Sequence, residues 1–169
     1  TMIKNVLRNT IIFSAILMLN CSSKQDCPEG INLLPMYGEV KKCAEQIEID
    51  NEFLADCDKL FKNRKEAAEK HVEMAWGYFY NNNPDNSMKR FNQAWLLDKD
   101  NAEIYWGFGN LMGMKHELKH SITLFEKSIK LNPNNPKVYE SISTSYGQLF
   151  FETKKMEYLE ATIKNLKSS

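Results

Sequence analysis

A period of 34 residues is the feature that most constrains how this chain of 169 residues folds. When the sequence is shifted by one period, the following identical residues are paired: Ala68 with Ala102, Glu69 with Glu103, Ser87 with Ser121, Phe91 with Phe125, Leu97 with Leu131 and Asn101 with Asn135. Each unit contains two stretches of apolar residues at helical spacing, separated by a polar turn. A helical unit of this length buries its apolar face only against its neighbours, so the period predicts an all-α chain of stacked helix pairs.

The unit 102–135 indicates how such a pair packs. Its two halves carry apolar side chains at helical spacing, first at Ile104, Phe108, Leu111 and Met112 and then at Ile122, Phe125 and Ile129. Small residues at Gly109, Ser121 and Ser128 allow the two helices to approach closely. The ring of Phe125 fills the space between them, and Pro133 ends the unit because a proline cannot continue a helix.

With these residues in these positions, the unit resembles the tetratricopeptide repeat. The matching positions are Phe108 and Gly109 for the Leu-Gly pair of that family, Ser121 and Ser128 for its two small residues, Phe125 for its aromatic residue and Pro133 for its closing proline. The resemblance covers about 100 residues, in repeats 68–101, 102–135 and 136–169. It implies a short right-handed α-solenoid of about three helix pairs, in a domain that spans 65–169.

The flanking units depart from this pattern. Unit 68–101 has His71 where a large apolar residue is usual, although Asn83 and Pro84 are well placed to begin its second helix as N-cap and first residue. Unit 136–169 ends in a more polar helix, which suits the last repeat of a stack because its outer face meets water. Ahead of the repeats, apolar residues at helical spacing predict an amphipathic helix over 49–64 that caps the first repeat.

The first twenty residues have the composition of an export signal. Lys4 and Arg8 are their only charges, and the apolar run over 11–19 is interrupted only by Ser14. A spanning helix needs about 20 apolar residues, about twice the length of this run, so we expect a signal peptide over 1–20 rather than a permanent membrane helix. The alternative is a cytoplasmic chain that buries these residues as an N-terminal helix.

A cysteine, Cys21, stands immediately after this apolar run. Its position resembles the lipobox of bacterial lipoproteins, in which such a cysteine is diacylated and becomes the mature N-terminus. The resemblance implies an exported protein, anchored by lipid at the bacterial outer membrane or in the periplasm. Residues 21–48, which include Pro28 and Gly30, are then expected to form a lipidated tether with little regular structure.

Three cysteines remain if Cys21 is lipidated, namely Cys27, Cys43 and Cys57. In an oxidising envelope they predict one disulfide and one leftover thiol. The sequence does not select the pair, and three free, partly buried thiols are the alternative. Because Cys43 and Cys57 lie about 21 Å apart along one continuous helix, these two can bridge only if the chain turns between them.

One short motif has the pattern of a catalytic metal site. His116-Glu117-Leu118-Lys119-His120 matches the H-E-x-x-H pattern of zinc proteases. In the repeat register, however, these residues fall in a turn and at the start of the following helix, and no histidine follows His120 to supply a third ligand. No phosphate-binding Walker loop, nucleophile elbow or CxxC pair occurs either. We therefore expect no enzymatic activity, no cofactor and no resident metal; the alternative is an envelope hydrolase that binds metal through His116 and His120.

The charge balance restricts the class of partner. Lys and Arg together number 22, as do Asp and Glu, so the formal net charge is zero. A nucleic-acid-binding surface needs an excess of cations, and we therefore expect no nucleic-acid partner. Two acyl chains anchor a protein without a polybasic patch, so this neutrality is compatible with a membrane location.

In the tetratricopeptide family the first helices of successive repeats line a concave groove that binds the partner. By register, the groove residues are Glu69, Val72, Trp76, Phe79, Tyr80, Glu103, Trp106, Asn110, Gly113, Met114, Lys137, Glu140, Thr144, Gly147 and Gln148. Large aromatic side chains are typical of binding hot spots, although the same rings can instead pack the first repeat against the preceding helix. The resemblance thus implies a scaffold or adaptor that binds a protein or peptide of unknown identity. A subunit whose aromatic surface is permanently occupied is a further alternative.

Overall fold

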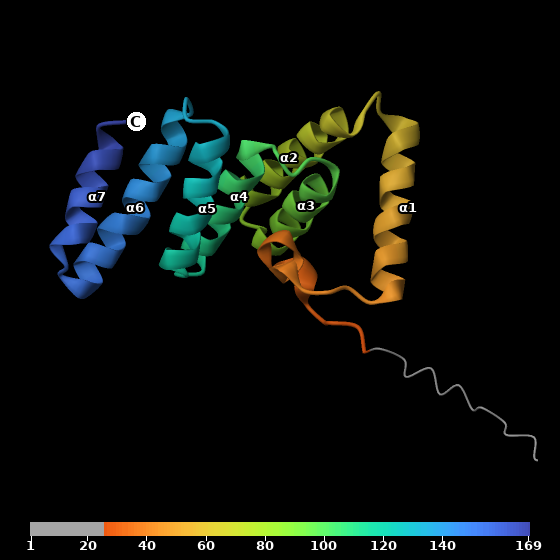
Figure 1. Cartoon of the computed structure of the whole chain (residues 1–169), viewed down its shortest axis with the longest axis horizontal. Helices are drawn as coiled ribbons and strands as arrows, with labels where there is room; N and C mark the ends of the chain where they lie inside the picture. The colour runs from red at the N-terminus through yellow and green to blue at the C-terminus, as the bar shows by residue number, and fades with distance from the viewer. Residues whose placement is uncertain (1–25) are drawn as a thin grey trace, which may run out of the picture.

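The computed structural model describes residues 26–169, and within them the protein is all-α, with seven α-helices, two short 3₁₀ helices and no strand (Figure 1). The predicted signal peptide 1–20 and Cys21 lie outside the described residues. The α-helices are α1 (Ala44–Leu60), α2 (Arg64–Tyr80), α3 (Pro84–Leu97), α4 (Ala102–Met114), α5 (Leu118–Leu131), α6 (Pro136–Thr153) and α7 (Met156–Leu166). Among the described residues, no helix combines the length and the apolar character that crossing a bilayer requires.

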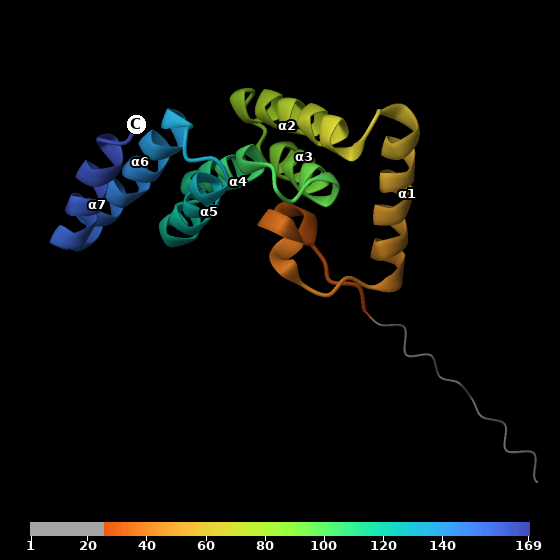
Figure 2. The same ribbon diagram turned by 45° about the horizontal axis from the view of Figure 1, so that its top comes forward.

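From α2 onward the helices pack as consecutive pairs. Helix α2 lies mainly against α3, α4 against α5, and α6 against α7. Contacts of α3 with α4 and of α5 with α6 join the pairs into a row along the long axis of the molecule (Figures 1 and 2). The order of these helices in space is therefore their order along the chain.

Asparagine caps begin four of the six helices of this row, namely α2, α3, α4 and α6. Asn101 and Asn135, one period apart, precede α4 and α6, and each side chain accepts a backbone N–H from the first turn. Asn83 caps α3 with Pro84 as its first residue, as the sequence predicts. Helix α2 begins after Asn63, one turn ahead of the predicted start of the first repeat.

Helix α4 contacts both of its neighbours through glycines. A Cβ atom added at Gly107 would lie 2.1 Å from Cζ of Phe91 in α3. A Cβ atom added at Gly109 would lie 2.5 Å from the ring of Phe125 in α5. Both rings are buried, so α3 and α5 approach α4 this closely because it carries no side chain at either position.

Buried serines connect α5 to α4. The hydroxyl of Ser121 donates to the carbonyl of Gly109 at 2.8 Å, and that of Ser128 donates to the carbonyl of Ala102 at 2.8 Å. The small residues predicted to permit close packing thus also supply hydrogen bonds between the two helices. Ser87, one period before Ser121, is equally buried, but its Oγ has no hydrogen-bond partner among the described residues.

The prediction of an irregular tether over 21–48 is wrong for the part that the structure describes. Residues 27–43, which we call the N-terminal strap, contain the 3₁₀ helices Ile31–Leu33 and Pro35–Glu39 and pack against α3. Helix α1 then begins at Ala44 and ends at Leu60, so it is displaced toward the N-terminus from the predicted 49–64. The strap is therefore an ordered part of the fold.

A buried side chain of α3, Asn92, fixes the strap. Its Oδ1 accepts the backbone N–H of Tyr37 at 3.2 Å, and its Nδ2 donates to the carbonyls of Asn32 and Leu34 at 3.0 and 2.9 Å. Asn92 is fully buried, so these bonds satisfy groups that would be costly to leave unpaired. Met36, Tyr37 and Glu39 have left-handed backbone angles, a conformation that non-glycine residues adopt at a cost and that the surrounding contacts must hold.

The strap is also closed by a disulfide between Cys27 and Cys43. Cys43 is at the same time the N-cap of α1, where its backbone N–H bonds the side chain of Gln46. Cys57 is a buried free thiol. The expected disulfide and leftover thiol are both present, and the pair that the sequence left open is Cys27 with Cys43.

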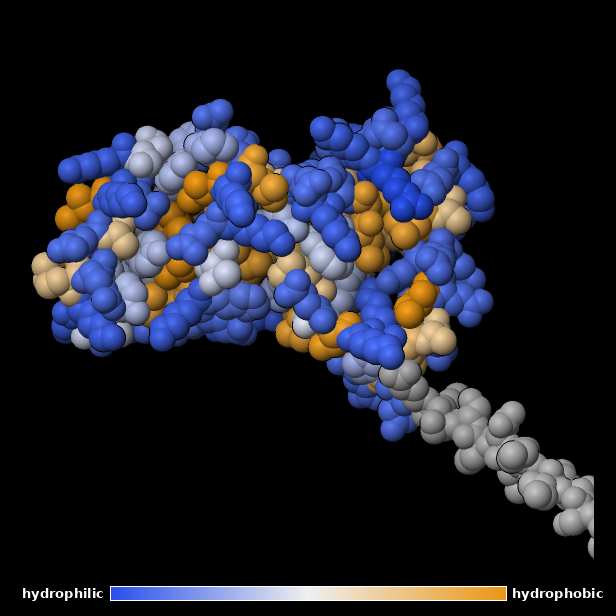
Figure 3. Space-filling view, viewed as in Figure 1, coloured by the Kyte–Doolittle hydropathy of each residue, from blue (hydrophilic) through white to orange (hydrophobic). Residues whose placement is uncertain are grey.

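The two ends of the helix row differ in how they are covered. Near α2 and α3, Cys57 of α1 is buried and Phe53, Leu54 and Phe61 pack against the core of the first pair, whereas Leu60 is 78% exposed. Figure 3 shows a recess between α1 and the row, with hydrophobic residues on its walls. At the other end α7 has no buried residue, in agreement with the more polar last helix that the sequence predicts.

Acid pH is expected to weaken the fold through His71. This buried side chain in α2 donates from Nδ1 to the carbonyl of Ala67 at 2.9 Å, and its ring meets Phe53 edge to face. Burial, with a smaller effect of Arg90, lowers the pKa of His71 below its usual value, against the opposing effect of the carbonyl. As the pH falls below about 6.5 the unfolded chain binds a proton before the folded one, so the free energy of unfolding decreases.

Urea denaturation between pH 7.5 and pH 5 measures this effect. His71→Gln removes the titrating ring and keeps a polar side chain, so its loss of stability over this interval is expected to be smaller. An equal pH dependence in the two proteins would show that His71 is not responsible.

Candidate functional site

The first helices of the three pairs, α2, α4 and α6, surround a hollow of about 470 Å³, which we call the groove hollow. Its lining consists of Phe79 from α2, Asn110, Gly113 and Met114 from α4, Ser121 and Phe125 from α5, and Glu140, Ser141, Thr144, Ser145 and Gln148 from α6. Apolar and polar groups contribute about equally, and Glu140 is the only ionisable side chain in the lining. The hollow can therefore take an apolar side chain that carries a polar or charged end.

Most of the lining comes from residues predicted for the groove. The predicted residues that the structure brings together in it are Phe79, Asn110, Gly113, Met114, Glu140, Thr144 and Gln148. The sequence missed Ser141 and Ser145, each one position beyond a predicted residue of α6, because register on a single helix does not fix its rotation against its neighbour. It also missed Ser121 and Phe125, which were predicted only as packing residues between α4 and α5.

Three aromatic side chains adjoin the groove hollow. The ring centroids of Trp76 and Trp106 are 4.5 Å apart, and Tyr80 stacks on Trp76 at 5.8 Å. The indole N–H of Trp76 donates to Glu103 Oε1 at 3.0 Å, and that of Trp106 donates to Ser141 Oγ at 2.9 Å. These bonds connect α2 with α4 and α4 with α6, so the rings belong to one surface across all three helices.

The remaining predicted groove residues separate into buried and exposed ones. Val72 is 5% exposed and packs in the hydrophobic core, so the structure does not place it in the lining of the groove hollow as its register predicted. Trp76 is partly buried and meets Phe91 of α3, its own partner helix, so this contact does not test the alternative that the rings pack against the helix that precedes the repeats. The exposed members outside the lining are Glu69, Tyr80, Glu103 and Lys137.

The H-E-x-x-H motif lies where the repeat register predicts, across the turn before α5. His116 has a left-handed backbone (φ 63°) and lies outside the helix, where its Nε2 contacts Glu152 Oε1 at 2.6 Å. His120 is inside α5, with its Nδ1 3.6 Å from Glu117 Oε2. Residues 26–169 contain no group of three or more His, Cys, Asp or Glu side chains arranged to hold a metal.

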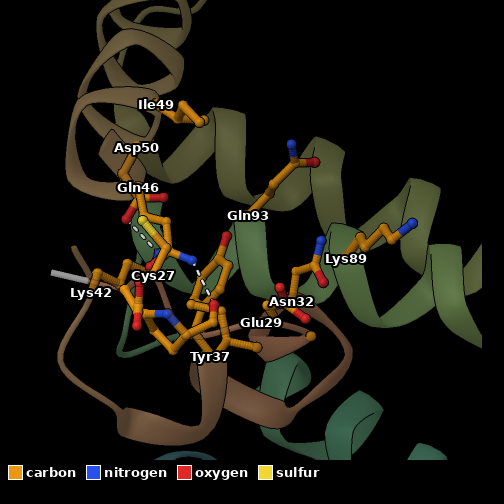
Figure 4. Close-up of a pocket in the computed structure, with 14 residues that line it drawn as sticks. Cys27, Glu29, Asn32, Tyr37, Lys42, Gln46, Ile49, Asp50, Lys89 and Gln93 are labelled. Atoms are coloured by element: carbon orange, nitrogen blue, oxygen red, sulfur yellow. Dashed lines mark hydrogen bonds and ion pairs between the residues drawn. The ribbon is translucent and has the colours of Figure 1, made fainter. Parts of the chain in front are cut away.

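A second hollow, of about 670 Å³, lies between the strap, α1 and α3 (Figure 4). Lys42 pairs with Asp50 inside it, and the Lys42 ammonium lies 3.2 Å from the ring centre of Tyr37. Gln46 donates to the carbonyl of Pro28 at 2.7 Å. Burial, assisted by Asp50, raises the pKa of Tyr37 well above its usual range, so this phenol stays neutral.

This second hollow could not be found from sequence, because it depends on the folded strap. Its wall includes Cys27, which places the disulfide beside the cavity, and Lys89 and Gln93 of α3 form the opposite side (Figure 4). The central charges compensate each other and the amides bond within the protein, so its polar groups serve first to hold the strap.

Comparison with known proteins adds no assignment to these sites. No protein-family model matches the chain, and no curated protein matches it significantly. The geometry of the groove hollow therefore carries the functional argument.

Proposed function

We propose that this protein is a lipid-anchored adaptor of the bacterial cell envelope that binds a protein or peptide partner in the groove hollow. In this proposal the helix pairs form a short right-handed solenoid of the tetratricopeptide type. The observation that carries it is the hollow itself, because three helices spaced by one sequence period contribute its walls. Stacked helix pairs commonly bind their partners on such a surface.

Exposed apolar side chains at the hollow support a binding role. Tyr80 is 74% exposed and Met114 51% exposed, and both belong to the predicted groove. A tyrosine or methionine in such a position gains buried area when a partner covers it, and Tyr is enriched among residues that dominate binding energy. Trp76 stacks on Tyr80, and Trp106 in turn contacts Trp76.

The proposed location rests on the sequence of the first 21 residues and on the disulfide. A disulfide between Cys27 and Cys43 suits an oxidising compartment such as the envelope. Lipidation at Cys21 would place the anchor six residues ahead of the ordered strap. The folded helices would then lie close to the membrane surface.

A metal-dependent hydrolase has less support. Two metal ligands one helical turn apart must project from the same helix face, and His116 lies in the turn outside α5. Its Nε2 contacts Glu152 of α6, and no group of three potential metal ligands is present in residues 26–169. The adaptor remains the function that the geometry favours.

Replacing Tyr80 and Met114 together by alanine is expected to weaken partner capture at least tenfold. Both side chains are exposed, so the change removes contact area from the groove without opening a cavity in the core. The measurement is affinity capture from envelope extracts on the immobilised full chain, with the amount of each captured protein quantified by mass spectrometry.

Phe151→Ala is the matched control. Phe151 is 71% exposed, close to the value for Tyr80, but it lies outside the lining of the groove hollow. This variant is expected to capture the partner as the native chain does. Equal losses in both variants, or no loss in the double variant, would contradict binding through the groove.

A further inference from the structure

We infer that the segment bound in the groove hollow is positively charged and presents lysine or arginine side chains to Glu103 and Glu140. This inference rests on the proposed adaptor function and names the chemistry of its partner. The chain as a whole is neutral, so the preference must come from how its charges are distributed.

The charges are divided between the first and second helices of the pairs. The first helices α2, α4 and α6 carry six acidic and four basic residues, whereas the second helices α3, α5 and α7 carry four acidic and six basic ones. The groove hollow is lined mainly by the first helices. The first helices therefore carry a net charge of −2 and the second helices one of +2.

Ion pairs within the protein involve two of the four basic residues of the first helices. Arg64 forms a bidentate pair with Asp58, and Lys70 pairs with Glu73. Helix α4 has no Lys or Arg at all. Among residues 26–169, Glu103 and Glu140 form no ion pair, and Lys137 is the only base assigned to the groove.

The two free carboxylates border the aromatic surface. Glu103 is held beside the indoles by the bond from Trp76, and Glu140 precedes Ser141, which accepts the bond from Trp106. A guanidinium or ammonium group placed there would meet a carboxylate together with the faces of aromatic rings, and both attract cations. An acidic segment would meet repulsion from the same groups.

The walls also suit the long aliphatic stems of these side chains. Phe79 and Met114 line the hollow, and Tyr80 is exposed beside Trp76. Lysine and arginine bury their methylene groups on apolar surface while the charged end reaches a polar one. The occupant is therefore a peptide segment in which basic residues approach the groove, with apolar residues between them.

Two synthetic pentapeptides test this inference on the full chain: acetyl-Leu-Arg-Ala-Arg-Leu-amide and the same peptide with glutamate in place of both arginines. Isothermal titration at low salt is expected to show binding of the basic peptide and at least tenfold weaker binding of the acidic one. Raising the salt concentration is expected to weaken the basic peptide further. Tighter binding of the acidic peptide, equal binding of the two, or binding of neither overturns the inference.

Variants in which glutamate is replaced by neutral glutamine test whether the basic peptide binds at Glu103 and Glu140. Glu103→Gln with Glu140→Gln is expected to weaken the basic peptide about tenfold, since two charge-assisted contacts are lost without a change in shape. Glu157→Gln with Glu160→Gln removes the same charge from α7, outside the groove, and is expected to have little effect. An equal loss in both variants would mean that net charge, not this site, attracts the peptide.

The proposed function and this inference are contradicted by different results. Loss of capture through Tyr80 and Met114 tests the groove whatever the charge of the partner. A partner that is captured through these residues but binds by an acidic segment would overturn the inference and leave the adaptor function in place.

Discussion

Gly107→Ala is expected to lower the free energy of unfolding by about 3 kcal/mol, because the new methyl group has no room between α3 and α4. The added Cβ would lie within 2.5 Å of three ring atoms of Phe91, and that ring is itself fully buried. Neither helix can yield without disturbing its own partner. Chemical denaturation followed by circular dichroism measures the change.

A second glycine provides the control. Gly77 lies in the exposed part of α2, and no atom lies within 4 Å of a Cβ added there. Alanine is the better helix former, so Gly77→Ala is expected to raise the free energy of unfolding by up to about 1 kcal/mol. If both substitutions change stability by the same amount, the close contact between Gly107 and Phe91 is not what couples the first two helix pairs.

Removing the disulfide between Cys27 and Cys43 is expected to cost about 3 kcal/mol, the loop-closure value for a bridge that spans 16 residues. The unfolded chain gains freedom, and the strap is then fixed chiefly by Asn92. The measurement compares urea denaturation of the oxidised and reduced protein. Hydrogen exchange at the backbone N–H of Tyr37, which bonds Asn92, is expected to accelerate on reduction.

The variant Cys27→Ser with Cys43→Ser separates the disulfide from other effects of the reductant. It is expected to match the reduced native protein and to be insensitive to reductant, since Cys57, the thiol that remains within residues 26–169, is buried and unpaired. Unchanged stability of the reduced native protein would show that Asn92 and the apolar contacts of Ile31 hold the strap without the bridge.

The helix pairs can be predicted from the sequence because the residues that determine them lie close together in the chain and recur with the 34-residue period. Asn101 and Asn135 cap helices that begin one period apart, and each does so through bonds to its own first turn. Gly109 faces Phe125 across a short turn, so the repeat alone predicts their contact. Helix start sites and the packing within a pair therefore follow from the 34-residue pattern.

The strap escaped prediction because the side chain that fixes it is remote in sequence. Asn92 bonds backbone groups that lie 55 to 60 residues earlier. Backbone groups are alike in nearly every residue, so no sequence pattern marks these as the partners of Asn92. Its polar side chain in α3 gives no sign that it will be buried. The prolines and glycines of the segment instead favour irregular structure, and the second hollow beside it remained hidden for the same reason.

The sequence predicted which helices line most of the groove hollow, but not the residues that α5 contributes to it. Register on the first helices selected the residues that point toward the groove, but it also selected Val72, which the rotation of α2 turns into the core. The repeat register of one helix does not indicate which residues of a neighbouring helix line the same hollow. Ser121 and Phe125 of α5 were therefore not predicted as lining residues.

The covalent bridge also sets the route by which mechanical load enters the molecule. Tension on the chain ahead of Cys27 passes through the sulfur atoms to Cys43 and then along the axis of α1, without stretching residues 28–42. The bonds between the strap and Asn92 form a second, non-covalent route from the N-terminal side to α3. Residues 28–42 are thus protected from being stretched, while the attachment of the strap to α3 and the packing of α1 on the helix row share the load.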